Sequence, residues 1–395
     1  MNISIKKIRA YLHTYRLCLR KFRITCVEPI FHFFPIKNKI LFANFMGKGL
    51  GDDPKYILLE LLKRENHPDL YWVVSNKNII VPEGVHKVKY FSVKYVYHLC
   101  TSKVWVFNIK NMWKVRKRKG QYYLQTWHAS LALKNVEKSV ATTLDDYCDL
   151  SQKDSKMIDL LYANNNKEIE VFKKDFWYDG PIIKTDVPRT GILINPQKGL
   201  KDKIGNALRF NSSKKIILYA PTFRKLSDIS LYIWDYNRVI TELSRRFGED
   251  YVFLLRLHPN ITSLATQLQY NNQIINATSY PDMQELLAVS DILLNDYSSS
   301  MFEFGYLRKP VFLYAKDRIE YTTSDRSLLF DLSDLPFSFS ESLDELCDNI
   351  KAFDPITYKL RCDDFYKKIG FEDNGNGASI ISEIIMNQFK TSEIS

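Results

Sequence analysis

The sequence predicts an α/β protein in which two Rossmann-like domains face each other across a cleft. Short apolar runs alternate with longer amphipathic stretches in both halves of the 395-residue chain, and this alternation is typical of parallel sheets covered by helices. The length also exceeds what a single hydrophobic core usually serves. We therefore expect one domain over residues 36–187, a second over 188–375, and a C-terminal helix and tail over 376–395.

The predicted strands are short runs rich in apolar residues. In the first half they lie at 40–45, 71–75, 104–108 and 122–125. A helix is expected at 53–63, between the first two strands. The second half repeats the pattern, with strands at 215–220, 251–257, 291–294 and 310–314 and helices near 236–247, 283–288 and 301–307.

Composition indicates a globular protein with an anionic partner but does not identify that partner. Hydrophobic residues make up 45% and charged residues 26%, which is ordinary for a globular protein. The formal net charge of +11 indicates an anionic partner: a nucleic acid, a phosphorylated substrate or an acidic membrane surface. The six cysteines have neither zinc-site spacing nor the density of a secreted disulfide scaffold, so a reducing cytosol is the expected compartment.

Residues 1–35 differ from the rest of the chain. On a helix they form a basic amphipathic arm suited to an anionic membrane surface, although a helix packed on the protein body with a solvated basic face fits equally well. No apolar run approaches the roughly 20 residues of a spanning helix, so we expect a peripheral protein. Seven basic residues precede the first acid, Glu28: Lys6, Lys7, Arg9, Arg16, Arg20, Lys21 and Arg23.

The segment 291–304 carries the strongest local signal. An apolar run ends in an acid, an aromatic residue and three hydroxyls just before a new amphipathic stretch, which reads as a strand, a tight turn and a helix start. Backbone N–H groups and the helix dipole at such a point favour an anion, and this predicts a phosphate-binding turn. The alternative is simple N-capping of a buried helix by Ser298 or Ser299.

Three further polar clusters follow apolar runs. Because ligands collect at the carboxyl ends of strands in open α/β sheets, we expect these clusters to share one site with the turn after residue 294. They are Gln125-Thr126-Trp127-His128-Ala129-Ser130, Tyr219-Ala220-Pro221-Thr222-Phe223-Arg224 and Leu255-Arg256-Leu257-His258-Pro259.

In order and spacing, these motifs resemble the CDP-glycerol glycerophosphotransferase family, whose enzymes build teichoic acids and related phosphopolyol polymers at bacterial membranes. The resemblance covers most of the chain after about residue 40 and implies the two-domain arrangement called GT-B. It implies transfer of glycerol phosphate from CDP-glycerol to an acceptor hydroxyl, with release of CMP. Other segments that resemble the family are 51–57, 188–190, 317–321, 326–331 and 371–375.

The resemblance assigns roles to individual residues. His128 is the expected general base, because an imidazole has the side-chain pKa nearest neutrality, and Trp127 beside it is expected to bind substrate. His258 is expected at the diphosphate, where it donates to the phosphoryl oxygens or assists the departure of CMP; the following proline is also a sufficient structural reason for that motif. The remaining expected substrate-binding residues are Thr222, Arg224, Arg256, Asp296, Ser298 and Ser299.

Two positions depart from the family pattern. Ala129 stands where the family usually has Gly after the histidine, which puts close approach of the backbone to substrate in doubt. Asn295 stands where Thr is common, a mild change at the turn. No metal and no cofactor are expected, since the paired acids at 52–53, 145–146 and 363–364 are more typical of helix starts or solvated acids.

The implied partners follow from the same resemblance. Residues 36–187 are expected to form the acceptor side and residues 188–375 the CDP-polyol side. We expect CDP-glycerol or CDP-ribitol as donor, a lipid-linked glycan as acceptor, and a peripheral position on the cytoplasmic face of the bacterial plasma membrane through residues 1–35. A nucleotide-sugar glycosyltransferase of GT-B type remains an alternative. A nucleic-acid-binding protein is disfavoured, because the basic residues concentrate at the N-terminus and the aromatic residues are spread through apparent core segments.

Overall fold

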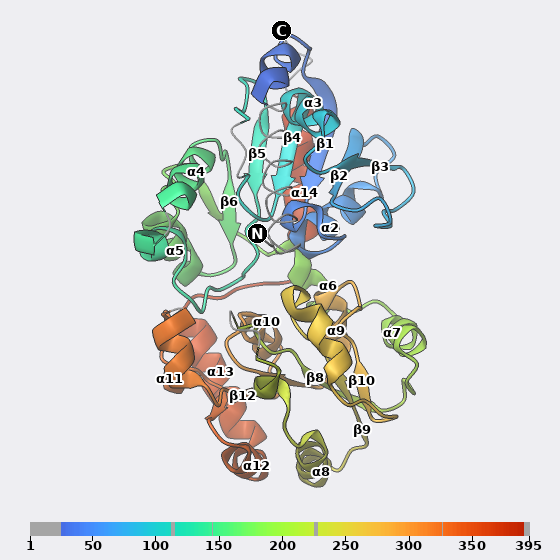
Figure 1. Cartoon of the computed structure of the whole chain (residues 1–395), viewed down its shortest axis with the longest axis vertical. Coiled ribbons are helices and arrows are strands. Elements are labelled where there is room, and N and C mark those ends of the chain that lie inside the picture. Colours follow the sequence, from blue (N-terminus) through green and yellow to red (C-terminus); the bar gives the residue numbers. More distant parts are fainter. Residues whose placement is uncertain (1–24, 112–114, 144, 225–227, 326, 391–395) are drawn as a thin grey trace, which may run out of the picture.

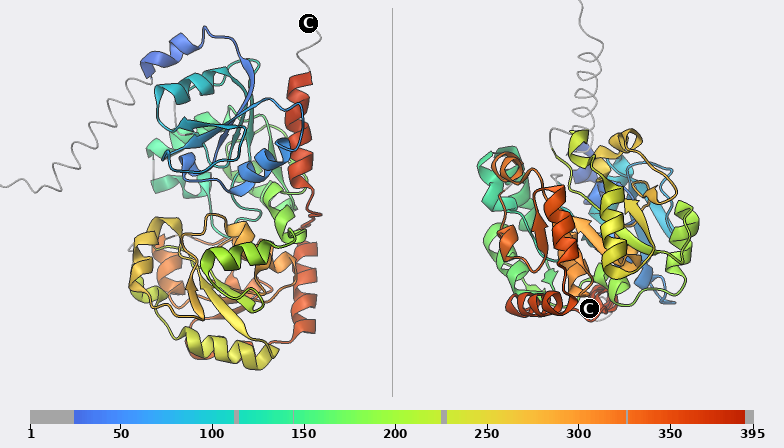
Figure 2. Two further views of the ribbon diagram at one scale, coloured as in Figure 1. Left: turned by 90° about the vertical axis from the view of Figure 1, so that its right-hand side faces the viewer. Right: turned by 90° about the horizontal axis from the view of Figure 1, so that it is seen from below.

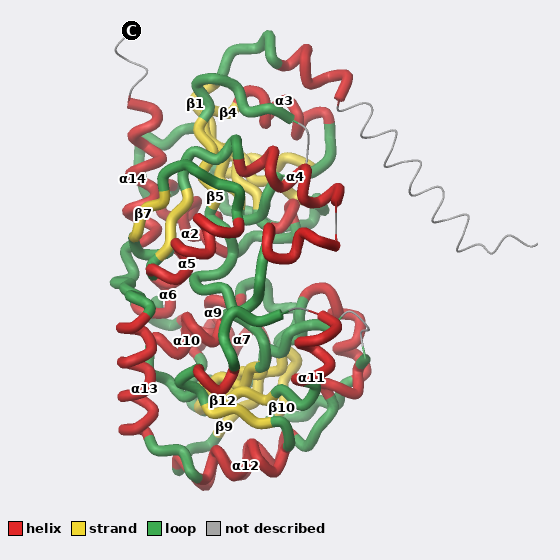
Figure 3. The backbone as a smooth tube through the Cα atoms, turned by 90° about the vertical axis from the view of Figure 1, so that its left-hand side faces the viewer, coloured by secondary structure: helices red, strands yellow, loops and turns green. Residues whose placement is uncertain are grey.

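The structure is a computed structural model that describes residues 25–111, 115–143, 145–224, 228–325 and 327–390. Two α/β domains follow one another along the long axis of the molecule (Figure 1). Each has a central parallel sheet between layers of helices, as the tube in Figure 3 shows. The predicted fold class is therefore confirmed.

The N-terminal sheet has five parallel strands in the order β3-β2-β1-β4-β5, a Rossmann order. Successive residues of β1 point to opposite faces, so Leu41 packs in the core under α3 while Phe42 packs under α2. The elements are β1 (Lys37–Ala43), α2 (Asp52–Leu61), β2 (Asp69–Val74), β3 (Val85–Lys89), α3 (Val93–Thr101), β4 (Ser102–Phe107) and β5 (Tyr122–Gln125).

A smaller unit follows β5 in the same domain. Its two strands pair in parallel, and a bridge between Leu124 and Leu160 links them to β5. The elements are α4 (Asp145–Ser155), β6 (Leu161–Ala163), α5 (Asn166–Asp175) and β7 (Ile182–Lys184). Short 3-10 turns in this half are η1 (Phe45–Gly47), η2 (Glu137–Thr143) and η3 (Pro188–Thr190).

The C-terminal sheet has six parallel strands in the order β10-β9-β8-β11-β12-β13. Counted within the domain this is again the Rossmann order, which reverses between β8 and β11. The strands are β8 (Lys215–Tyr219), β9 (Tyr251–Leu255), β10 (Ile274–Asn276), β11 (Ile292–Asn295), β12 (Val311–Tyr314) and β13 (Ser338–Ser340).

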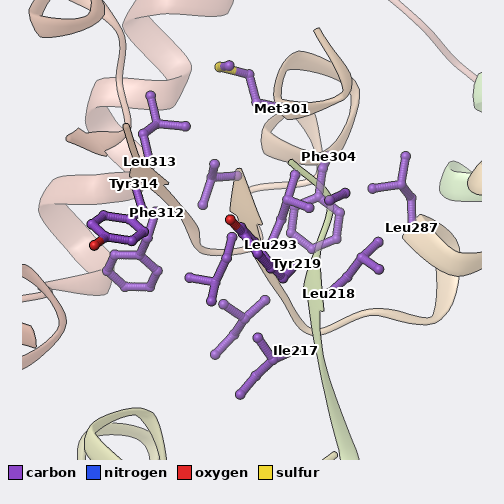
Figure 4. Packing of buried hydrophobic residues seen from close by; sticks show 14 of the residues in the cluster. Ile217, Leu218, Tyr219, Leu287, Leu293, Met301, Phe304, Phe312, Leu313 and Tyr314 are labelled. Atoms are coloured by element: carbon purple, nitrogen blue, oxygen red, sulfur yellow. The ribbon is translucent and has the colours of Figure 1, made fainter. Parts of the chain in front are cut away.

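The helices of this domain cover both faces of its sheet. Figure 4 shows the core that results, with Leu218 and Leu293 of neighbouring strands beside Phe304 of α10. The helices are α6 (Gly191–Ile194), α7 (Leu200–Leu208), α8 (Tyr236–Phe247), α9 (Met283–Val289), α10 (Ser300–Tyr306), α11 (Arg318–Glu320), α12 (Leu343–Lys351) and α13 (Pro355–Lys368). The short turns are η4 (Ile229–Tyr232), η5 (Pro259–Gln267), η6 (Tyr321–Asp325), which is a π turn, and η7 (Leu332–Asp334).

The last helix returns to the first domain. α14 (Gly377–Lys390) packs beside α2, and Ile381 and Ile385 are fully buried in the N-terminal core (Figure 2). Gly377 makes this return possible, because an added Cβ would lie 2.4 Å from the backbone of Val187. The chain thus crosses between the domains twice, before and after the C-terminal sheet.

The predicted membrane arm falls largely on residues 1–24, which lie outside the described residues. The described part begins with a helix at 25–31. Phe31 and Phe34 pack edge-on against Tyr97, whereas Phe33 is 89% exposed. No helix within the described ranges has the length and apolar character needed to cross a membrane.

Candidate active site

The predicted motifs all lie at the carboxyl ends of strands. In the C-terminal domain, Thr222 follows β8, His258 follows β9 and Asp296 follows β11, so they surround the point where the strand order reverses. In the N-terminal domain His128 follows β5. The two sets meet at the junction of the domains, where the Ser130 hydroxyl donates to Glu303 of α10 at 2.6 Å.

His128 is held in one tautomer by the backbone. Its Nδ1 lies 3.0 Å from the carbonyl oxygen of Asn108, the residue after β4. Because a carbonyl only accepts, Nδ1 carries the proton and the neutral ring keeps its lone pair on Nε2. Burial lowers the pKa of His128 below its ordinary value, so the ring stays neutral near pH 7. This arrangement suits a general base.

Aromatic neighbours fix the plane of the His128 ring. Trp127 lies 4.1 Å away between ring centroids, is only 6% exposed, and packs at its other side on Phe176. Its backbone is left-handed, with φ of 55°, a strained conformation for a bulky residue. Phe45 lies 5.3 Å from the same histidine ring. Trp127 therefore packs between His128 and Phe176 and holds the His128 ring in place. The predicted contact of Trp127 with substrate stays a prediction.

His258 is held in the opposite tautomer. Its Nδ1 accepts the backbone N–H of Asn260 at 3.1 Å and thereby caps η5. The proton of the neutral ring therefore sits on Nε2, which makes that atom a donor. Burial lowers the pKa of His258 to about 4. The positive charges of Lys134 and Lys48, both from the N-terminal domain, also lower it.

Those two lysines were not predicted as site residues. The segment that carries Lys134 pairs with a segment of the C-terminal domain. Lys134 forms an antiparallel bridge with Leu328, and the backbone N–H of Leu329 donates to the carbonyl of Leu133. Its Nζ lies 5.3 Å from the ring centroid of Tyr321. No sequence pattern marks these residues, because their placement depends on how the two domains meet.

The turn after β11 is built around Asp296. Its carboxylate accepts the backbone N–H groups of Thr222, at 2.9 and 3.1 Å, and of Tyr297. Arg224 donates to Asp296 at 2.9 Å and to Asp317 at 2.6 Å. The guanidinium also lies against the ring of Tyr297. The predicted phosphate contact of Arg224 would thus share a group that two carboxylates already hold.

Two predicted residues keep unused hydrogen-bonding capacity. Among the described residues, Thr222 Oγ1 is buried and has no hydrogen-bond partner. Arg256 donates to the carbonyl of Tyr280 at 2.6 Å, and in the described ranges no carboxylate forms an ion pair with it. Burial lowers the pKa of Arg256 to about 10. Asp282 acts on the half-buried guanidinium from a distance, but no carboxylate pairs with it directly, so both side chains fit a phosphate ligand.

The serines after β11 form a small hydroxyl cluster. Ser298 Oγ and Ser300 Oγ lie 3.0 Å apart, and the Asn295 amide donates to Ser300 Oγ at 3.2 Å. Ser299 stands at the N-cap of α10, but its hydroxyl makes no capping hydrogen bond. Asn295, the departure from the family pattern, therefore braces the turn.

Within the described ranges no group of three or more His, Cys, Asp or Glu residues could hold a metal ion.

Two Rossmann-like domains, with a last helix that returns to the first and histidines from both sides at the junction, define the GT-B class of group-transfer folds. The chain belongs to the CDP-Glycerol:Poly(glycerophosphate) glycerophosphotransferase family, whose family model matches residues 27–387.

Characterised relatives agree with this assignment. The chain is 32% identical over 367 residues to the teichoic acid poly(glycerol phosphate) polymerase of Staphylococcus epidermidis, covering 89% of this chain and 51% of that protein. It therefore spans about half the length of that polymerase. It is 30% identical to the teichoic acid glycerol-phosphate transferase of Staphylococcus aureus, covering 89% of this chain and 93% of that protein.

Solved structures show the same likeness. The wall teichoic acid polymerase TagF superposes with a TM-score of 0.82 at 29% identity, covering 100% of both chains. A histidine-to-asparagine variant of TagF soaked with CDPG superposes with a TM-score of 0.83 at 29% identity, covering 99% of this chain and 100% of that one. The predicted family and the predicted GT-B fold are thus confirmed.

Proposed function

We propose that this protein transfers glycerol phosphate from CDP-glycerol to a hydroxyl group of a lipid-linked acceptor and releases CMP. The observation that carries this proposal is the pair of opposite histidine tautomers. His128 offers a lone pair at Nε2 from one domain, and His258 offers an N–H at Nε2 from the other. The family and the named relatives, a glycerol-phosphate transferase and polymerases, supply the substrate class.

The reaction breaks the phosphoanhydride bond of the donor diphosphate and forms a phosphodiester with the acceptor. The acceptor oxygen attacks the phosphorus that carries glycerol, a new P–O bond forms, and the bond from this phosphorus to the oxygen of CMP breaks. His128 Nε2 takes the proton of the acceptor hydroxyl. The leaving phosphate gains negative charge, which the N–H of His258 and the guanidinium of Arg256 are suited to stabilise.

The donor diphosphate is proposed to bind in the C-terminal domain. Thr222 Oγ1 lacks a partner in the described structure and Arg256 lacks a paired carboxylate, so a phosphate would satisfy both. Ser298 and Ser299, at the turn before α10, add hydroxyl donors on the same strand edge. Asp296 and Arg224 keep the turn in shape through their mutual ion pair.

The acceptor is proposed to approach His128 from the N-terminal domain. A lipid-linked glycan requires the enzyme to work at a membrane, and residues 1–35 supply a basic arm for the cytoplasmic face of the bacterial plasma membrane. The product would be a teichoic acid or a phosphopolyol-containing capsule. In both cases the chain acts as a peripheral membrane enzyme.

The test is acceptor-dependent release of CMP. Purified full-length protein is incubated with a lipid-linked acceptor and, in separate reactions, with CDP-glycerol, CDP-ribitol or a nucleotide sugar; His128→Ala is the control. We expect CMP with CDP-glycerol and its loss in the variant. CMP with CDP-ribitol alone would assign a ribitol-phosphate transferase. Release of a nucleoside diphosphate from the sugar donor would replace the proposal by a glycosyltransferase.

A further inference from the structure

A buried arginine joins the two domains beside the proposed site. Arg189 lies in η3, where the chain first crosses between domains, and its side chain is 4% exposed. We call this arginine and its partners the Arg189 cluster. The partners are Asp52 of α2, Glu303 of α10 and Ser130, with guanidinium contacts of 2.5 Å to Asp52, 2.5 and 2.8 Å to Glu303 and 3.4 Å to Ser130.

One arm of the cluster leads to the base. Asp52, which Arg189 holds, accepts the side-chain N–H of Asn108 at 2.7 Å. The backbone carbonyl of the same Asn108 accepts the Nδ1 proton of His128 and fixes its tautomer. Asp52 also adopts a left-handed backbone, with φ of 58°, a conformation that costs free energy and persists only where the surrounding structure enforces it. A chain of two hydrogen bonds thus separates the Asp52 carboxylate from the catalytic ring.

The other arm leads to the donor side. Glu303 accepts from Arg189 and from the hydroxyl of Ser130, which is only two residues after His128. Its second oxygen accepts the Gln284 amide at 2.9 Å, so the carboxylate is held from α9 as well. Glu303 lies one turn into α10, the helix that follows Ser298 and Ser299. The cluster therefore contacts the His128 loop from one domain and α10, the helix that begins just after the proposed phosphate-binding turn, from the other.

We propose that Arg189 is a positioning residue that sets His128 at the correct distance from the donor phosphorus by joining the His128 loop to α10. The inference rests on the proposed function, because a distance between base and phosphorus matters only if transfer occurs. The Arg189 side chain is buried and its guanidinium is held by Asp52, Glu303 and Ser130, so it acts through these partners. A displacement of a base by about 1 Å can lower the rate about 100-fold, so substitution of Arg189 should have a large effect on kcat.

A second ion cluster at the junction provides a matched control. Lys55 of α2 forms ion pairs with Asp282 and, at 2.9 Å, with Glu285 of α9. It joins the same two domains, but within the described ranges it forms no hydrogen bond or ion pair with His128, Ser130 or Asn108. If the Arg189 cluster served only to hold the domains together, loss of Lys55 would have the same consequences as loss of Arg189.

The experiment compares three variants of the full chain: Arg189→Gln, Ser130→Ala and Lys55→Met. Arg189→Gln should lower kcat about 100-fold while the Kd for CDP-glycerol, measured by calorimetry, changes less than about threefold. Ser130→Ala removes one hydroxyl and leaves the ion pairs intact, so the fold is retained; kcat should fall about tenfold. Lys55→Met should lower the melting temperature and change kcat by less than about threefold.

The pH dependence of kcat/KM distinguishes the two roles, because a residue that only holds the domains together would not shift it. The charged groups that act on His128 are Asp52 of α2 and Glu137 of η2, which raise its pKa, and Arg189 of η3, which lowers it. Loss of the arginine charge should therefore shift the acidic limb of kcat/KM to higher pH. Lys55→Met should leave that limb in place.

Two outcomes would overturn the inference. One is an Arg189→Gln variant whose kcat is within threefold of wild type; the other is a fall in kcat matched by Lys55→Met, with the acidic limb unmoved in both. Nitrogen NMR of the His128 ring separates this failure from failure of the proposed function, because it follows the tautomer and titration without any turnover. Suppose that wild type releases no CMP but the His128 titration still shifts in Arg189→Gln. The proposed reaction would then be rejected, while the influence of Arg189 on His128 would stand.

Discussion

Replacement of Arg256 by Met should make the ligand-free protein more stable and its donor binding weaker. Burial lowers the pKa of this guanidinium from its ordinary value to about 10, which corresponds to about 3 kcal/mol at about 1.4 kcal/mol per pKa unit. Part of the side chain still reaches water, so this penalty is an upper bound. Since Arg256 is charged at every pH below about 10, the penalty acts throughout the neutral range.

Methionine removes the charge and keeps most of the apolar length of the side chain. The variant loses one hydrogen bond to the carbonyl of Tyr280, worth about 1 kcal/mol. The net gain is therefore at most about 2 kcal/mol, which would raise the melting temperature by about 4 °C for a domain of this size. In contrast, loss of a charge-assisted bond to phosphate should weaken CDP-glycerol binding by about 10- to 100-fold.

Thermal denaturation with and without CDP-glycerol tests both effects. Wild type should gain stability with the donor, by about 2.7 kcal/mol at a concentration 100 times the Kd, and at the same concentration Arg256→Met should keep only about 0.4–1.4 kcal/mol of that gain. Arg308→Met is the matched control, because Arg308 in the same domain pairs with Asp363 at 2.8 Å away from the site. An Arg256→Met protein that is less stable than wild type and still fully stabilised by the donor would refute the reasoning.

Four further results are expected. His128→Asn should lower kcat by about 10²- to 10⁴-fold with little change in donor affinity. Because burial lowers the pKa of His128, the acidic limb of wild-type kcat/KM should lie below the pKa of an ordinary imidazole, about 6.5; a limb above that pH would contradict this assignment. The pKa of His258 is about 4 when folded and near 6.5 when unfolded, so the unfolded chain binds more protons and stability should fall as pH drops from 6.5 to 4; denaturant midpoints should show a smaller loss in His258→Gln. Asp296→Asn breaks a buried pair with Arg224 and should cost about 3 kcal/mol in the free energy of unfolding. Gly377→Ala presses a methyl group into backbone 2.4 Å away and should cost about 1–3 kcal/mol; an unchanged melting temperature would argue against the close return of α14.

The strands that sequence patterns predicted are those with continuous apolar runs. All eight appear within a few residues of the expected bounds, because a strand buried on both faces needs such a run. The predicted strand at 40–45 ends at Ala43, since Phe45 turns the chain with φ of 41°. β3 was missed because Val88 is its one buried residue, and β10 and β13 are only three residues long.

The site was predictable up to the motif and no further. The order of His128, Thr222, His258 and Ser298 along the chain pointed to strand ends, and the structure places each of them just after a strand. The contacts between motifs could not be predicted from the sequence, because they join residues far apart along the chain; Arg224, for example, pairs with an aspartate 93 residues away. The same holds for Arg189, whose motif resembled the family pattern but whose partners lie on elements from both domains.

With His128 as base, the acceptor hydroxyl is expected to attack the phosphorus that carries glycerol. The most direct measurement uses CDP-glycerol radiolabelled at that phosphorus, a lipid-linked acceptor and purified full-length protein, and follows where the label goes. The account predicts label in the extended acceptor and unlabelled CMP, both much slower in His128→Asn. Label released as CDP, with glycerol on the acceptor, would place the attack at carbon and contradict the account.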